Sequence, residues 1–426
     1  MKNFFLSFFF FQFSLSYFAQ DSLKTRKILD TLCSPNMHGR GYVKNGERIA
    51  AEFISSEFKK SWLKSFLFET YLQPFPVSVN TFPGKMYFSA GDSVLTPGKD
   101  FLVMPFSGSI KKKSFKIIFL NKDVVSVESA FAKFKLQDFS EVFLILDKSG
   151  VSDSSRLEIF EEMLQNPLKA KGIIVLSEAK LTHGLASREV NYPVLEVLKS
   201  ALPLSFKKIC VEVENVFFEK YFTQNVIGYV EGTQFPDSFL VFSAHYDHLG
   251  RMGNAACFPG ANDNASGTAM LLRLSEYFAK NPQKMSIAFI AFGAEEAGLV
   301  GSKYFTLHPL FPLKKIRFLT NLDILGTGDE GIMVVNATEY PKEFENLKKI
   351  NSENKFLSDI RERGKAKNSD HYFFSEMGVP SFFIYTLGGT KAYHDIYDKA
   401  ENLPLTEFED ISKLLIIFSE FLQNTN

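Results

Sequence analysis

Histidine and carboxylate side chains recur in the second half of the chain, several of them directly after a run of apolar residues. The set comprises His245, Asp247, Asp263, Glu295, Glu296, Asp323 and His394. Imidazoles and carboxylates together are the ligands that a pair of divalent cations uses, and a further carboxylate can act as a base for a water nucleophile. The residue types and their spacing therefore predict a site for metal-assisted hydrolysis.

Each of these residues, taken singly, also has a simpler explanation. A histidine at the end of a strand is often a structural group, and Asp263, before a helical run, could cap a helix. The adjacent acids Glu295 and Glu296 could be a solvated turn. Their joint occurrence at consecutive strand ends favours the metal site, and Asp247 could fix the tautomer of His245 by accepting a hydrogen bond from its second ring nitrogen.

The elements that must position these residues follow a regular alternation. Short apolar runs predict strands at 239–243, 287–292, 316–322, 332–335 and 381–385. Helical spacing of apolar residues predicts helices at 45–60, 265–280, 298–308, 341–354, 370–377 and 405–423. We expect an α/β three-layer sandwich with a mostly parallel central sheet, in which functional sites collect at the carboxyl ends of strands.

Between these elements, residues 75–215 have a different sequence pattern, in which short strand-like runs such as 143–146, 172–176 and 192–197 are separated by turns. This pattern predicts a small β-rich domain inserted into the first. The expected organisation is a catalytic domain formed by residues 20–74 and 216–426, interrupted by an inserted domain at 75–215.

The first residues predict the destination of the chain. Residues 1–19 combine a charged start, a phenylalanine-rich apolar run and a small residue at Ala19, which is typical of a secretory signal peptide. A retained anchor is the alternative; we expect cleavage and export to the periplasm or the exterior. No later stretch is apolar for long enough to cross a bilayer.

Bulk composition excludes some classes of function. The formal net charge is zero and the pI is about 7.1, so no basic field attracts nucleic acid. The 3 cysteines permit at most one internal disulfide.

Several ordered motifs are similar to those of the M28 family of zinc-dependent exopeptidases, which includes co-catalytic aminopeptidases and the glutamate carboxypeptidase II type. They are HYDHLG (245–250), PGANDNASG (259–267), AFGAEEAGLVGS (291–302), NLDILG (321–326), SDHYFF (369–374) and YHDIYD (393–398). The opening CSPNMHGRGYVKNGERIAAEFI also resembles the start of the family, and the inserted segment resembles a protease-associated domain. The resemblance implies the zinc exopeptidase fold.

The resemblance also implies a set of ligands for two zinc ions. His245, Asp263 and Asp323 would hold one ion. Asp263, Glu296 and His394 would hold the other, so that Asp263 bridges the two.

The resemblance assigns the catalytic groups as well. Glu295 would be the general base, Asp247 the partner of His245, and Tyr393 a donor to the oxyanion. The family further implies a cis peptide bond after Asp263. His248 and His371 lie near the motifs but are not needed as ligands, and we interpret them as residues that line or support the site.

We expect an enzyme that hydrolyses peptide bonds at chain ends, most simply an aminopeptidase. A carboxypeptidase or dipeptidase, a glutaminyl cyclase on a related one-zinc fold, and a metal-free binding module are the alternatives. Cys257, six residues before Asp263, could bind zinc but is better explained as an ordinary loop cysteine.

Overall fold

The computed structural model describes residues 23–424 of the 426-residue chain. The expected signal peptide at 1–19 lies outside the described residues. Among the residues that are described, none of the helices combines the length and the apolar character needed to span a membrane. All 3 cysteines are free thiols, so no disulfide links the lobes described below.

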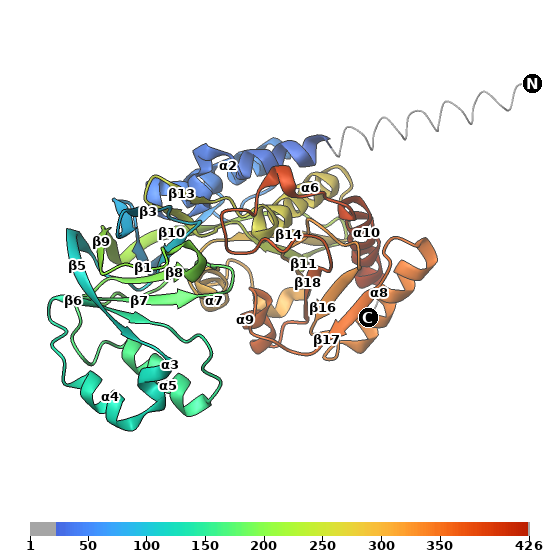
Figure 1. The fold of residues 1–426 in the computed structure, drawn as a ribbon. Coiled ribbons are helices and arrows are strands. Elements are labelled where there is room, and N and C mark those ends of the chain that lie inside the picture. Colours follow the sequence, from blue (N-terminus) through green and yellow to red (C-terminus); the bar gives the residue numbers. More distant parts are fainter. Residues whose placement is uncertain (1–22, 425–426) are drawn as a thin grey trace, which may run out of the picture.

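The larger lobe is built on an eight-stranded sheet (Figure 1). In spatial order its strands are β1 (Leu72–Thr81), β10 (Val216–Val230), β14 (Met285–Phe292), β11 (Phe235–His245), β15 (Ile316–Leu322), β18 (Ser381–Thr386), β16 (Ile332–Val335) and β17 (Ile360–Arg363). The central strands β14, β11, β15 and β18 are parallel, whereas β10 and β16 flank them antiparallel. The expected mostly parallel α/β sheet is confirmed.

Helices cover both faces of this sheet, which makes the lobe a three-layer sandwich. On one face lie a helix at 23–32, α2 (Gly46–Lys60), α6 (Gly267–Lys280), α8 (Pro341–Asn354) and α10 (Phe408–Asn424). On the other face lie α7 (Val300–Leu307) and α9 (His371–Glu376). The helix α10 shows why the sequence folds this way, because Ile411, Leu415, Phe418 and Leu422 form one apolar stripe and all are buried.

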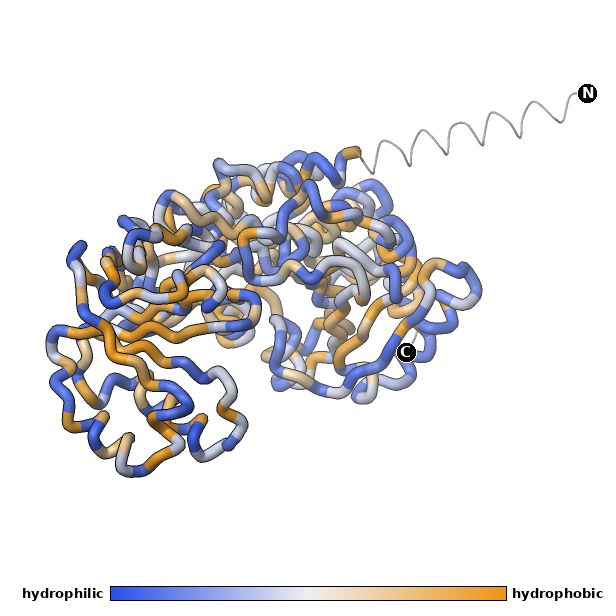
Figure 2. Tube along the Cα trace, viewed as in Figure 1, coloured by the Kyte–Doolittle hydropathy of each residue, from blue (hydrophilic) through white to orange (hydrophobic). Residues whose placement is uncertain are grey.

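The smaller lobe contains a second eight-stranded sheet. Its strands are β2 (Met86–Ala90), β3 (Ser93–Leu95), β4 (Phe101–Val103), β5 (Ile110–Leu120), β6 (Val142–Leu146), β7 (Gly172–Ser177), β8 (Val194–Leu198) and β9 (Lys208–Val213). The short helices α3 (Lys122–Ser126), α4 (Glu128–Lys135) and α5 (Ser154–Leu164) cover one face. Figure 2 shows the central strands of this sheet as continuous hydrophobic tubes, as expected for strands covered on both faces.

The other face of the second sheet packs against a hairpin of the larger lobe. This hairpin, β12 (Gly250–Met252) and β13 (Ala256–Phe258), directly follows the HYDHLG motif. Met252 and Phe258 are fully buried in the same hydrophobic cluster as Phe88 and Phe101 of the second sheet. The two lobes therefore share a core beside the residues expected to bind metal.

The chain passes between the lobes through β1 and β10, which pair with each other over most of β1. Residues 72–81 thus belong to the first sheet, and the second sheet begins at Met86. The division into domains at 75 and 215 stays a prediction, as does the resemblance of the smaller lobe to a protease-associated domain.

Candidate metal centre

The candidate site lies where the parallel central strands end. His245 is the last residue of β11 and is in register with Phe292, the last residue of β14. A short turn then leads to Glu295, and Asp323 directly follows β15 on the other side of β11. Because the carboxyl ends of parallel strands meet at one edge of the sheet, residues far apart in sequence are brought together there.

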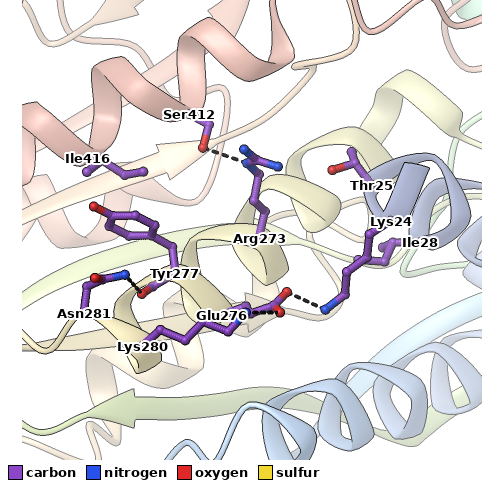
Figure 3. A pocket seen from close by; sticks show the side chains of 10 residues that line it. All are labelled: Lys24, Thr25, Ile28, Arg273, Glu276, Tyr277, Lys280, Asn281, Ser412 and Ile416. Carbon is purple, nitrogen blue, oxygen red and sulfur yellow. Dashed lines mark hydrogen bonds and ion pairs between the residues drawn. The ribbon is translucent and has the colours of Figure 1, made fainter. Parts of the chain in front are cut away.

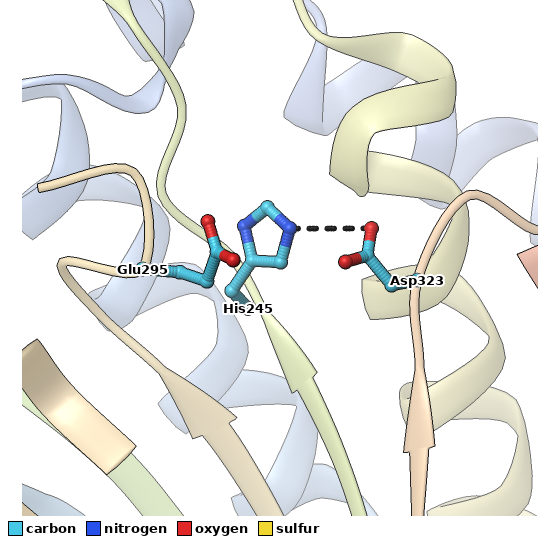
Figure 4. Close-up of side chains that lie close together, drawn as sticks. All are labelled: His245, Glu295 and Asp323. Atoms are coloured by element: carbon cyan, nitrogen blue, oxygen red, sulfur yellow. Dashed lines mark hydrogen bonds and ion pairs between the residues drawn. The ribbon is translucent and has the colours of Figure 1, made fainter. Parts of the chain in front are cut away.

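The imidazole of His245 lies between the carboxylates of Glu295 and Asp323 (Figure 4). Its Nε2 atom is 3.3 Å from Asp323 Oδ1 and also 3.3 Å from Asp263 Oδ1. His245 is only 1% exposed. One ring nitrogen of His245 therefore faces two acids in a nearly dry environment.

Asp263 lies in the loop that precedes α6 and contacts both imidazoles of the site. While its Oδ1 faces His245, its Oδ2 is 3.0 Å from His394 Nε2. The peptide bond between Asp263 and Asn264 is cis, as expected. The two oxygens of one buried carboxylate thus point to two different histidines.

The loop that carries Asp263 is held by main-chain contacts. The carboxylate of Asp398 accepts hydrogen bonds from the backbone N–H groups of Asn262, at 2.9 Å, and Asp263, at 3.1 Å. Gly260 has a φ of +57°, and a Cβ atom there would lie 2.4 Å from the ring of His248. The loop therefore needs glycine at this position.

The carboxylate of Glu296 contacts two histidines, His394 and His248. Its Oε2 is 3.2 Å from His394 Nε2, and its Oε1 is 2.7 Å from His248 Nδ1. The ring of His248 is fully buried. We interpreted His248 from the sequence as a lining residue, and the structure places it in direct contact with a candidate ligand.

Asp247 supports the neighbouring acids through their main chain. Its carboxylate accepts hydrogen bonds from the backbone N–H groups of Glu295, at 3.1 Å, and Glu296, at 3.3 Å. His245 Nδ1 is 3.2 Å from the main-chain carbonyl of Asp247 but 3.9 Å from its carboxylate. The contact expected between the Asp247 carboxylate and His245 is therefore made by the main-chain oxygen instead.

The loop after β18 carries Tyr393 and His394. The ring of Tyr393 stacks on that of His394, with 3.9 Å between centroids and 13° between planes, and Tyr393 is 47% exposed. His394 Nδ1 is 3.1 Å from the main-chain carbonyl of His183, a residue of the smaller lobe. The second imidazole of the site is therefore positioned from both lobes.

Electrostatics in the site reflect several acids at close range. Burial raises the pKa of Glu295 well above its usual value, His245 opposes this shift, and the charge of Glu296 adds to it. Burial alone would lower the pKa of His394, but Asp263 and Glu296 outweigh it and raise the pKa to about 9. Close acids that favour a positive charge among them are a suitable environment for metal cations.

The donor atoms fit divalent metal ions in type and spacing. Two groups have ligand atoms within 4.8 Å of one another: His245 with Glu295 and Asp323, and His248 with Asp263 and Glu296. Imidazole nitrogens and carboxylate oxygens are common zinc ligands. A cavity of about 440 Å³ opens beside them, with Leu299, Ile324 and Phe383 on its walls. Donor atoms suited to divalent cations therefore line a cavity that is open to a ligand.

Two supporting residues were not predicted from the sequence. The fully buried guanidinium of Arg40 donates to the carbonyls of Tyr246, Pro259 and Gly260 at 2.8, 2.7 and 2.6 Å. Ser369 Oγ donates to Asp323 Oδ2 at 2.9 Å. Both residues lie within the quoted motifs, but nothing in the sequence identifies the atoms that they contact.

The remaining candidates lie outside the two donor groups. His371 is fully buried and packs its ring 5.3 Å from that of Phe383. Cys257 lies in β13 as a free thiol. A separate pocket of about 60 Å³ lies where the helix at 23–32, α6 and α10 meet (Figure 3). There Lys24 and Lys280 both pair with Glu276, so this pocket is a polar seam between helices.

The chain is similar in sequence to known peptidases. Aminopeptidase YwaD of Bacillus subtilis is 27% identical over 259 residues, which cover 58% of this chain and 56% of that protein. A probable zinc metalloprotease of Leptosphaeria maculans is 35% identical over 111 residues, covering 25% of this chain and 26% of that protein. This chain thus aligns with about half the length of the first relative and about a quarter of the second.

Solved structures share the fold across nearly the whole chain. A zinc aminopeptidase from Bacillus subtilis has a TM-score of 0.70 at 20% identity and covers 94% of this chain and 96% of its own. An aminopeptidase from Aneurinibacillus sp. strain AM-1 has a TM-score of 0.60 at 18% identity, with 94% and 92% covered. Identities this low show the fold. The sequence profile of peptidase family M28 matches residues 225–419, which include every candidate ligand. Over these residues the chain matches peptidase family M28.

Proposed function

We propose that this protein is a zinc-dependent aminopeptidase that holds two zinc ions and releases residues from the amino terminus of peptides. The observation that carries this proposal is the Asp263 carboxylate, whose oxygens lie 3.3 Å from His245 Nε2 and 3.0 Å from His394 Nε2. A carboxylate between two imidazoles is suited to bridge two cations. The aminopeptidases among the relatives support the choice of substrate end.

The ligands divide around this bridge. His245, Asp263 and Asp323 would hold one zinc, and Asp263, Glu296 and His394 would hold the other. Zinc at these positions would polarise the scissile carbonyl and lower the pKa of a water molecule.

Glu295 is the proposed general base. It lies beside His245 (Figure 4), whereas its neighbour Glu296 contacts His394. Glu295 takes a proton from the water whose oxygen attacks the carbonyl carbon, and returns a proton to the amine nitrogen as the C–N bond breaks. Asp247 orients Glu295 through its backbone N–H, and Tyr393 donates a hydrogen bond to the developing oxyanion.

The substitution Glu295→Gln tests the role of the base. With zinc still bound, the variant should lose roughly a hundredfold to ten-thousandfold in kcat, because an amide cannot carry the proton. The assay is hydrolysis of an aminoacyl anilide, with zinc content measured on the same sample. Glu345→Gln, an exposed acid on α8, is the matched control. Substantial activity in a zinc-loaded Glu295→Gln protein contradicts the assignment.

One observation favours a carboxypeptidase as the second candidate. Lys367, which is exposed, lines the cavity beside the acids, and its ammonium group could hold a substrate carboxylate. An N-blocked peptide with a free carboxyl terminus distinguishes the two. An aminopeptidase leaves this peptide intact. In that case the Lys367→Met variant should hydrolyse the aminoacyl anilide at the rate of the unaltered protein. Cleavage of the blocked peptide alone, weakened by Lys367→Met, would establish the carboxypeptidase.

We also propose that the protein is exported after cleavage near Ala19. The support is the composition of residues 1–19, a charged start before an apolar run. Expression of the full chain followed by determination of the mature amino terminus tests this. An intact Met1 on membrane-bound protein would indicate a retained anchor instead.

A further inference from the structure

The loop after β7 reaches from the smaller lobe to the candidate metal centre. The backbone N–H of His183 donates to the carbonyl of His394 at 2.8 Å, and the His183 carbonyl lies 3.1 Å from His394 Nδ1. Two hydrogen bonds thus tie the same pair of residues together. One of them involves the side chain of a proposed zinc ligand.

The second bond determines which nitrogen of His394 is offered to metal. A main-chain carbonyl can only accept, so it requires a proton on Nδ1. In the neutral ring that binds metal, Nε2 then keeps its lone pair, and it faces Asp263 Oδ2 at 3.0 Å and Glu296 Oε2 at 3.2 Å. A hydrogen bond of this kind from a ligating histidine fixes both the tautomer and the ring orientation.

Packing holds the His183 main chain in place. His183 is 5% exposed, and its ring stacks on Phe258, with 4.8 Å between ring centroids and 18° between planes. Its Nδ1 atom has no hydrogen-bond partner. The ring therefore acts as a flat aromatic group, and the neighbouring Leu181 is buried in the same hydrophobic cluster as Phe258.

Lys180 makes a second connection to the same loop. Its ammonium group lies 2.5 Å from Asp395 Oδ2 and donates to the carbonyl of Lys391 at 2.9 Å. Asp395 is 5% exposed, and its other oxygen accepts from the backbone N–H of Asp398 at 3.1 Å. Asp398 in turn binds the backbone N–H of Asp263. A continuous series of contacts therefore leads from Lys180 to the main chain of Asp263.

We propose that Lys180 and His183 are positioning residues for the His394 half of the metal centre, so that the smaller lobe forms part of the metal site. This inference rests on the proposed two-zinc function. Neither side chain touches metal or substrate; each acts by holding the loop at 391–398.

The first test measures zinc affinity in the full-length protein by competition with a chromophoric chelator. His183→Ala should weaken the binding of one of the two ions by about 10- to 100-fold and leave the other unchanged. His183→Phe keeps the flat ring and should bind both ions as the unaltered protein does. Lys180→Met should weaken the binding of the same ion, and Lys180→Arg should bind both ions as the unaltered protein does.

Two matched controls separate positioning from loss of stability. Phe160→Leu removes packing from the buried face of α5 within the smaller lobe, away from the loop at 391–398. Lys199→Met breaks the ion pair with Asp147 in the same lobe. Both should leave both zinc affinities unchanged, although Phe160→Leu lowers the melting temperature.

Hydrogen exchange gives a reading that does not depend on metal. His183→Ala and Lys180→Met should accelerate exchange of the amides at 391–398 and leave exchange in α5 unchanged. Phe160→Leu should accelerate exchange in α5 and leave the amides at 391–398 unchanged. Unchanged exchange at 391–398, unchanged zinc affinity in His183→Ala, or failure of His183→Phe to restore it would each overturn the proposal. Absence of zinc binding in the unaltered protein would overturn the proposed function, while the exchange result still decides whether the smaller lobe holds the loop.

Discussion

The two imidazoles of the candidate centre have the same chemical arrangement but different supports. Each directs Nε2 towards Asp263 and Nδ1 towards a main-chain carbonyl. For His245 that carbonyl belongs to Asp247, two residues further on, and the side chain is 2% exposed. For His394 it belongs to His183, 211 residues earlier in the chain, and the side chain is 18% exposed.

This difference shows that the sheet positions the residues around His245, whereas contacts between the two lobes position His394. The His245 half uses the ends of adjacent parallel strands, whose hydrogen bonding fixes the side chains that follow them. The His394 half uses a loop, which needs contacts from elsewhere to hold a defined geometry. We therefore expect changes in the two halves to have separable effects on metal binding.

The largest effect is expected from Asp263→Asn, which changes the residue shared by both halves. The amide offers one oxygen in place of two, so both ions should bind more weakly. Activity should fall by more than the roughly hundredfold expected for loss of a supporting contact. Metal analysis and anilide hydrolysis check this, with Asp237→Asn, an exposed acid of β11, as the control. Retention of both ions at normal affinity would remove Asp263 as the bridge.

A smaller effect is expected from Asp247→Asn, which keeps the shape but removes the charge beside the His245 half. Its carboxylate accepts from two backbone N–H groups, and the amide can accept through only one oxygen. We expect kcat/KM to fall by about 10- to 100-fold. Steady-state kinetics measure this against Asp92→Asn, an exposed acid of the smaller lobe. An unchanged kcat/KM would mean that the main chain alone orients Glu295 and Glu296.

Stepwise chelation compares the halves directly. The ion held by the loop half should leave first, with an affinity about tenfold weaker, at the lower end of the range for supporting contacts. Removal of zinc by a graded chelator, followed by a crystal structure of the partly depleted protein, identifies the remaining ion. If the remaining zinc ion lay beside Glu296 and His394, the expected order of release would be wrong.

The smallest effect is expected from Tyr393→Phe. The phenol is 47% exposed, so water competes for its hydrogen bond, while the stacking on His394 survives in phenylalanine. We expect kcat to fall by less than about a hundredfold, with KM and zinc content unchanged. Tyr397→Phe, on the same loop and 50% exposed, is the control. A fall in zinc content would show that Tyr393 supports the metal and not the oxyanion.

Much of the larger lobe could be predicted because its strands are continuous apolar runs. The strands predicted at 316–322 and 332–335 and the helix at 341–354 agree with β15, β16 and α8 residue for residue. The strands β1 and β10 were not predicted, because they carry polar residues such as Gln73, Thr223 and Gln224 that are buried against partners distant in sequence. Short apolar runs identify the central parallel strands well, and they identify strands that carry buried polar residues poorly.

The sequence alone determined the types of the candidate ligands and the places of His245, Glu296 and Asp323 at or just after strand ends, because apolar periodicity is local and parallel strands bring their ends to one edge. Tertiary structure decided which atoms meet. The contacts of Asp398 with the Asp263 loop, of Arg40 with four carbonyls and of His183 with His394 all involve main-chain atoms. Every residue carries such atoms, so residue types cannot identify these partners, and only the tertiary packing selects them.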